Sequence, residues 1–112
     1  MHFFIRGFDG ATAHALVGDR IKRAQVFADE YDQRAESGVL GYQKGQGIAV
    51  AKMMLYVWAD AFYSGLHAAK VSSDDAAPFF PDTVLRRLDP DHSEEQFYPE
   101  LRAWTRELES KP

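Results

Sequence analysis

The segment from Ile48 to Lys70 constrains the fold of this chain more than any other. Its apolar residues recur at helical spacing, and they are Ile48, Ala51, Leu55, Trp58, Phe62, Leu66 and Ala69. Its polar residues form an opposing stripe with the same period, which consists of Lys52, Tyr56, Asp60, Tyr63, His67 and Lys70. Two opposed stripes of this length predict one amphipathic helix. The competing interpretation is a short buried strand over residues 53–58, followed by a helix over residues 61–70.

A second helix is predicted over about residues 12–36. Its apolar positions are spaced by three and four residues and comprise Val17, Ile21, Ala24, Ala28, Tyr31 and Ala35. Asp9 either begins a tight turn with Gly10 or caps this helix. Gly18 lowers helix propensity, so the helix alternatively begins at Asp19, with residues 11–17 as a strand. Gly38 fits the C-terminal end of the helix.

The remaining elements are shorter. Residues 2–8 are rich in aromatic and β-branched side chains, which predicts an N-terminal strand. Residues 38–47 contain four glycines and predict a loop or a very short hairpin. Asp82 is predicted to cap a short helix through Leu88, which the Asp89-Pro90 pair ends. A last helix either carries a kink at Pro99 or begins there.

These elements predict one domain over residues 1–112 and a mainly α fold. It has about four helices, two of them long and antiparallel, and the short N-terminal strand. In the alternative, strands at 2–8, 38–43, 50–59 and 83–88 and helices at 19–37 and 60–70 give the order βαββαβ. That order and the chain length resemble the dimeric α+β barrel superfamily of small isomerases, cyclases and cofactor-free oxygenases. The resemblance rests on topology alone.

Composition excludes several classes of protein. The chain has 112 residues and no cysteine, which excludes a disulfide scaffold, a zinc ribbon and a thiol nucleophile. The net charge is −4, and residues 74–112 hold 10 acidic but only 5 basic side chains. This balance argues against sequence-independent nucleic-acid binding, apart from a local patch at Arg20, Lys22 and Arg23. With no signal peptide or membrane span, we expect a cytoplasmic protein, and the Ala- and Arg-rich usage suggests a bacterial or phage gene.

No motif for catalysis, for a cofactor or for a metal is present, so we expect no cofactor and no metal site. Asp60, Ser64 and His67 share a helix face, but Asp60 and His67 are about 10 Å apart along the axis, too far for a nucleophilic triad. His2 and His92 are expected to be terminal or at the surface. If the chain is an enzyme of the alternative fold, the first candidates for acid–base catalysis are Asp9, Tyr42, Asp60 and His67.

The sequence therefore favours a small non-enzymatic protein that acts by binding another protein, as inhibitors, immunity proteins and adaptors do. Exposed aromatic residues mark such surfaces. The candidate partner-binding residues, several of them outside the clear helical stripes, are Tyr42, Lys44, Phe79, Phe80, Phe97 and Tyr98. For Phe79 and Phe80, the alternative is that they fill the core. The aromatic content, 13%, is high for one small core and also fits a homodimer.

Overall fold

The first long helix, α2 (Gly10–Glu36), begins at a cap made by Asp9. The structure, a computed structural model, describes residues 8–110, except the side chains at positions 104, 105 and 107–109. Asp9 accepts hydrogen bonds from the backbone N–H of Ala11 (3.1 Å) and the Thr12 hydroxyl (2.6 Å). The Thr12 hydroxyl, together with backbone N–H groups, holds the pKa of Asp9 below its usual value. The helix therefore starts before Gly18, and the alternative strand over residues 11–17 is wrong.

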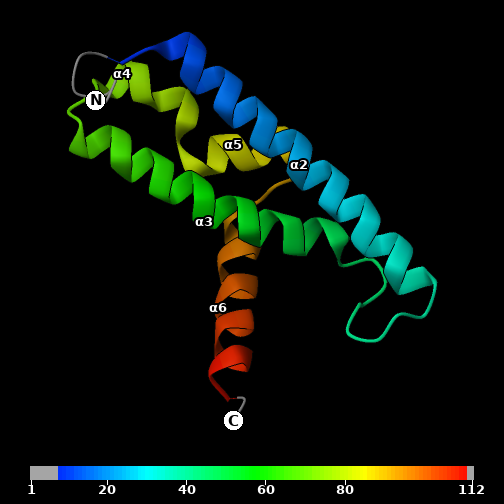
Figure 1. Cartoon of the computed structure of the whole chain (residues 1–112). Helices are drawn as coiled ribbons and strands as arrows, with labels where there is room; N and C mark the ends of the chain where they lie inside the picture. The colour runs from blue at the N-terminus through cyan, green and yellow to red at the C-terminus, as the bar shows by residue number, and fades with distance from the viewer. Residues whose placement is uncertain (1–7, 111–112) are drawn as a thin grey trace.

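The second long helix, α3 (Gly47–Ala68), runs without interruption through residues 53–58. The predicted single helix is confirmed, and the competing strand interpretation is wrong. The predicted loop between the two helices is also present, and Gly38 adopts the positive φ of 78° that favours glycine just after a helix end. Figure 1 shows α2 and α3 lying side by side and antiparallel, joined by this loop.

The second half of the chain is built from α4 (Ser73–Ala76), the 3-10 turn η1 (Ala77–Phe79), α5 (Pro81–Leu88) and α6 (Glu94–Ser110). Helix α5 begins at Pro81 and includes Asp82 in its first turn, so the predicted cap by Asp82 is wrong. Asp89 ends the helix, as predicted. The last helix begins at Glu94 and keeps Pro99 in its interior, so the alternative start at Pro99 is wrong. The fold is thus mainly helical, with four helices of two turns or more among the described residues.

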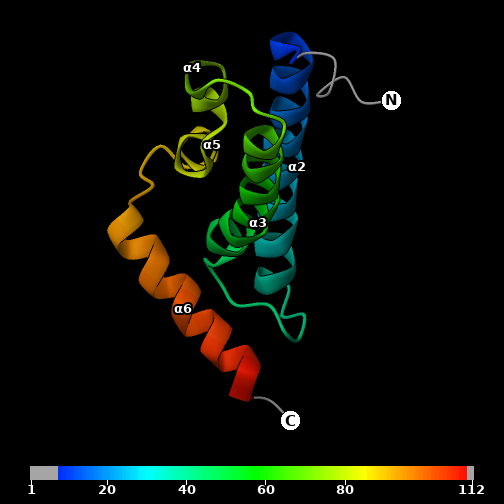
Figure 2. The ribbon, with the colours of Figure 1, turned by 90° about the vertical axis from the view of Figure 1, so that its left-hand side faces the viewer.

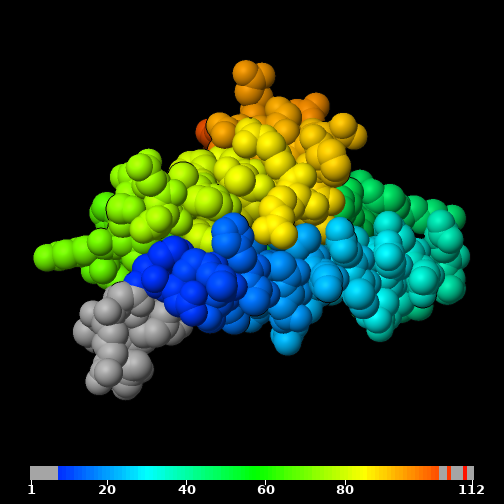
Figure 3. Space-filling view, turned by 90° about the horizontal axis from the view of Figure 1, so that it is seen from above, coloured from blue at the N-terminus to red at the C-terminus, as the bar shows by residue number. Residues whose placement is uncertain are grey.

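The helices form layers. Figure 2 shows α4 and α5 on one face of the α2–α3 hairpin and α6 farther out on the same side. Figure 3 shows the same order from above, with α5 between α2 and the start of α6. The core between the layers contains Val17, Leu55, Leu66, Phe79, Val84, Leu85 and Phe97.

The βαββαβ alternative is not what the chain forms. Its strands at 50–59 and 83–88 lie within α3 and α5, and residues 38–43 form part of a loop. The predicted strand at 2–8 lies outside the described residues, apart from Phe8, which is coil. Within residues 8–110, no helix combines the length and the apolar character that a membrane span needs.

Candidate functional site

The most deeply buried polar contact joins His92 to Asp82. Asp82 lies in the first turn of α5, and His92 lies in the loop before α6. His92 Nε2 is 3.0 Å from Asp82 Oδ1, and the two side chains are 0% and 3% exposed. The expectation that His92 lies at the surface is therefore wrong. Burial of this kind is stable only when the polar groups pair with one another.

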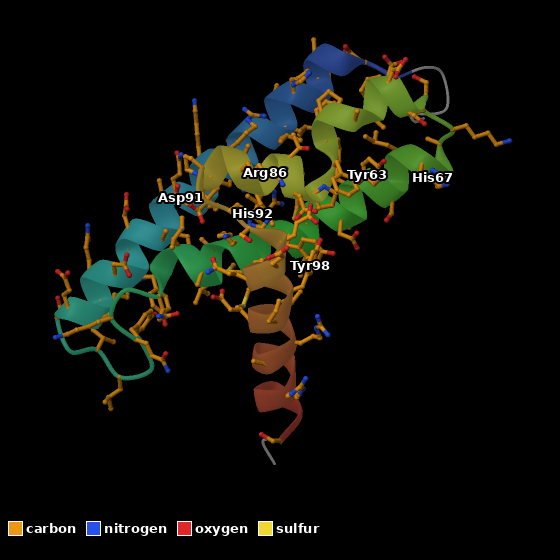
Figure 4. All side chains as sticks on the ribbon, turned by 180° about the vertical axis from the view of Figure 1, so that it is seen from behind. Tyr63, His67, Arg86, Asp91, His92 and Tyr98 are labelled. Atoms are coloured by element: carbon orange, nitrogen blue, oxygen red, sulfur yellow. The ribbon has the colours of Figure 1, made fainter. Side chains whose placement is uncertain are left out.

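Tyr98, in the first turns of α6, extends this contact. Its hydroxyl donates to Asp82 Oδ2 at 3.3 Å, and its ring packs edge-on against Tyr56 of α3. Burial, the hydrogen bond with Tyr56 and the negative charge of Asp82 all raise the pKa of Tyr98 well above its usual value. Figure 4 shows His92 and Tyr98 together at the start of α6, against α5. This buried polar junction, Asp82, His92, Tyr98 and Tyr56, thus joins three helices.

A second polar contact lies beside the junction. Lys52 Nζ of α3 donates to Asp89 Oδ2 at 2.9 Å, with the two side chains only 11% and 22% exposed. The ammonium group also lies 5.5 Å from the centre of the Phe97 ring. Burial acts to raise the pKa of Asp89, but hydrogen bonds from Lys52 and the backbone N–H of Asp91 outweigh it and lower the pKa. The pair stabilises the ionised carboxylate where α5 ends.

Replacing Asp89 with asparagine should lower the free energy of unfolding by about 1–2 kcal/mol at pH 7. Because the folded-state pKa of Asp89 is below the unfolded value of about 3.9, its ionised form stabilises the protein fully above that value. The stabilisation is lost as the pH falls through the folded-state pKa. Urea denaturation at several pH values should therefore show the difference between wild type and Asp89→Asn shrinking below about pH 4.

The matched control is Asp19→Asn, which removes an ion pair with Arg23 whose side chains are more than half exposed. This change should cost less than about 1 kcal/mol at any pH. A difference between wild type and Asp89→Asn that stays constant down to pH 2 would contradict the assignment.

The buried polar junction contains the atoms of a catalytic acid–base pair, but no substrate could reach them. A catalytic histidine must reach a substrate, whereas the side chain of His92 is fully enclosed. Its second ring nitrogen, Nδ1, is buried and has no hydrogen-bond partner among the described residues. The junction therefore fixes the start of α6 on α5 and α3, and we assign it a structural role.

An unusual surface lies on the face of the α2–α3 hairpin that points away from α4 and α5. On α3, Met54, Val57 and Ala61 are exposed at helical spacing, and Val50, one turn earlier, is half-buried. None of these four carries a charge, although the exposed Asp60 lies beside them. Met54 and Val57 are 54% and 63% exposed. A solvent-facing helix stripe is normally polar. Figure 1 looks onto this face, with α5 behind the hairpin.

Residues of α2 complete this surface. A hollow of about 200 Å³ lies between the helices, lined by Arg20, Arg23, Ala24, Phe27, Ala51, Met54, Leu55 and Trp58. A second hollow of about 310 Å³ shares Arg23 and Phe27 with it and continues over Lys22, Val26 and Glu30. The guanidinium of Arg20 lies 5.2 Å from the centre of the Trp58 ring. We call these hollows, together with the outward stripe of α3, the hairpin groove.

The four candidates for acid–base catalysis are not brought together. Asp9 caps the start of α2, whereas Tyr42 lies in the loop at the other end of the hairpin and packs on Tyr31. Asp60 and His67 are exposed on α3. Figure 4 places His67 far along α3 from the junction. Within residues 8–110 these four side chains therefore form no cluster, and the βαββαβ order that suggested them is not present.

The six candidate partner-binding residues also separate. Phe79 and Phe97 are 1% and 2% exposed, so their side chains lie in the core and not at the surface. Tyr98 is half-buried in the junction. Phe80 is 43% exposed, and its ring packs edge-on against Tyr63. Tyr42 and Lys44 share the loop between α2 and α3, where Tyr42 is half-buried and Lys44 exposed.

Neither the hairpin groove nor the burial of His92 is predicted by the sequence. The sequence does contain an indication of the groove, because the apolar residues Met54 and Val57 belong neither to the predicted polar stripe of α3 nor to its core-facing stripe. A helix with so wide an apolar arc needs more than one partner layer. For His92 and Asp82 no local signal exists, since they meet only through the turn between α5 and α6.

No group of three or more metal-ligating side chains is assembled within the described residues. A comparison of the chain with protein-family models, curated proteins and solved structures found no match. The geometry of the chain itself is therefore the basis for any functional argument.

Proposed function

We propose that this protein acts by binding another protein, and that the hairpin groove is the binding surface. The exposed stripe on α3 carries the proposal. Monomeric proteins rarely leave contiguous apolar surface in water unless it binds something. Here two large apolar residues on one helix face, Met54 and Val57, are more than half exposed beside a hollow lined by Phe27 and Trp58.

Full burial of a Met or Val side chain contributes about 1.5–3 kcal/mol relative to exposure. Arginine and tryptophan are the residue types most enriched among those that dominate binding energy, and Arg20 and Trp58 lie together in this groove. A partner that covers Met54, Val57 and Trp58 would gain the type of contact that sustains a specific complex.

The size and charge of the chain are compatible with an inhibitor, immunity or adaptor protein of bacterial or phage origin. The net charge of −4 favours a protein partner over nucleic acid. A second copy of the chain is another partner that the same face would suit.

The test replaces Val57 with glutamate, which places a charge in the middle of the exposed stripe. Because Val57 is 63% exposed, the folded state should be retained, with a stability change of about 0.5 kcal/mol or less. Full-length wild type and Val57→Glu are used as bait in extract of the native host, and any specific partner is then purified. For that partner we expect the dissociation constant to rise at least about tenfold, because a buried unpaired charge is costly.

The matched control is Thr83→Glu, which adds the same charge at an exposed position of α5. It should leave the dissociation constant unchanged. A partner bound equally well by wild type and by Val57→Glu, or weakened only by Thr83→Glu, would show that another surface carries the function.

A further inference from the structure

We infer that the partner which covers the hairpin groove is a second copy of this chain, bound with its α3 antiparallel to the α3 of the first copy. This inference rests on the proposed function, because it names the partner of the same surface. It follows from the order of large and small side chains along α3, from the area of the face and from the position of the acidic residues in the fold.

The uncharged stripe on the outward face of α3 continues beyond Ala61. Ser64, Gly65 and Ala68 are exposed and lie one and two turns farther along the same face. A Cβ atom built at Gly65 would meet no atom of any other element within 4 Å, so the surface is open there. The first half of the stripe thus carries larger side chains than the second half. The larger ones are Val50, Met54 and Val57, and the smaller ones are Ala61, Ser64, Gly65 and Ala68.

An antiparallel second copy of α3 is complementary in shape to this stripe. With a two-fold axis near position 59, Val57 faces position 61 of the second copy, and by symmetry Ala61 faces its position 57. Met54 faces position 64 in the same way, and Val50 faces position 68. Each larger side chain therefore meets a small one, which lets the two helices interdigitate. A parallel copy would instead place large side chains against large ones.

The area of the face is sufficient for a specific but reversible dimer. The stripe from Val50 to Ala68 is about 27 Å long at 1.5 Å per residue, and two adjacent helices present a face about 20 Å wide. Val26 of α2, which is 54% exposed, adds apolar surface beside the stripe. Two copies would bury about 1,100 Å² in total, near the lower limit of about 1,000–1,200 Å² for specific interfaces.

The distribution of charge also favours contact through this face. A second copy repeats every charge of the first, so an interface between copies must avoid like charges. The seven positions of the stripe carry no charge, whereas residues 74–112 hold 10 acidic and 5 basic side chains. Most of these acidic residues belong to α4, α5 and α6, which lie on the other side of the hairpin (Figure 2). Contact through α3 therefore keeps the acidic parts of the two copies apart.

Asp60 borders the stripe and makes the antiparallel arrangement testable. It is exposed and lies one position from the two-fold axis, so the two copies place this carboxylate along the same edge of the interface. Their repulsion should weaken the dimer, and Asp60→Asn should therefore lower the dissociation constant about two- to threefold. For the same reason, raising the salt concentration from about 50 mM to about 500 mM should lower the dissociation constant of the wild type.

Sedimentation-velocity ultracentrifugation of the full-length protein, up to about 500 µM, measures the self-association, and we expect a dimer with a micromolar dissociation constant. Ala61→Phe tests the fit between the two copies. The ring would meet Val57 of the second copy, where the antiparallel contact leaves room only for a small side chain. Because Ala61 is exposed, the monomer should stay folded, while the dissociation constant should rise at least tenfold.

The matched control is Ala103→Phe, which makes the same change at an exposed position of α6 and should leave the dissociation constant unchanged. A compensating variant combines Val57→Ala with Ala61→Val and so exchanges the large and the small side chain across the two-fold axis. This variant should dimerise as the wild type does. Val57→Glu, which places a charge near the axis, should raise the dissociation constant at least tenfold.

The outcomes separate the inference from the proposed function. A chain that stays monomeric at about 500 µM, a dimer that Ala61→Phe leaves intact, or a dissociation constant that rises with salt would overturn the inference. If the chain is monomeric while Val57→Glu weakens a partner purified from the host, the inference fails and the proposed function stands. If Val57→Glu changes neither a dimer nor the binding of such a partner, both fail.

Discussion

Replacing Phe79 with alanine should lower the free energy of unfolding by about 3–5 kcal/mol. The side chain is 1% exposed and fills the space between the layers. Its ring lies 4.8 Å from His14 and 5.8 Å from Phe62, measured between ring centres. Alanine would leave a cavity lined by both long helices. Urea denaturation monitored by far-ultraviolet circular dichroism measures this loss.

The neighbouring residue provides the control. Phe80 is 43% exposed and contacts Tyr63 at an edge, so Phe80→Ala should cost only about 1 kcal/mol. The pair also separates the two roles considered for these phenylalanines. A larger loss for Phe80→Ala than for Phe79→Ala would contradict the assignment of Phe79 to the core.

Gly47 is the second position where a small change should have a large effect. A methyl group on Gly47 would come within 2.7 Å of Asp32 Oδ1 and still closer to the carbonyl oxygen of Ala28. The backbone N–H of Gly47 donates to the same Asp32 oxygen at 3.0 Å, so the start of α3 is held directly against α2. Because the carbonyl belongs to the backbone of α2, Gly47→Ala should destabilise the fold by about 3 kcal/mol.

Gly18 offers the opposite case in the interior of α2. Apart from its chain neighbours and the backbone of its own helix, no atom lies within 4 Å of the position that its Cβ would occupy. Gly18→Ala should therefore stabilise the protein by about 0.5–1 kcal/mol through helix propensity alone. Thermal or urea unfolding of Gly47→Ala and Gly18→Ala tests whether α3 approaches α2 this closely at Gly47. Equal effects of the two substitutions would mean that α2 and α3 are not so tightly joined at Gly47.

The two long helices could be predicted because their signal is local. The apolar positions of α2, such as Val17, Ile21 and Ala28, repeat at three and four residues and are all buried. The end of α2 just before Gly38 and the end of α5 at Asp89 also follow from single residues whose backbone preferences stop a helix.

The site could not be predicted to the same degree, because its residues come together only in three dimensions. The sequence placed Lys52 and Tyr56 on a polar stripe, but not against Asp89 and Tyr98, which lie more than 35 residues later in the chain. The hairpin groove depends on which face of α2 and α3 the later helices cover. No local pattern decides that α5 packs on one face and leaves the Met54 side open.

The order of the helices along the chain has a consequence for how the molecule forms. Because α2 and α3 are consecutive and joined by a short loop, their mutual contacts require little loop-closure entropy. The hairpin would form early, as the chain leaves the ribosome. Phe79 and Leu85 would then dock on a surface that already exists. The last helix, attached through His92 and Phe97 near its start, would assemble last and open first.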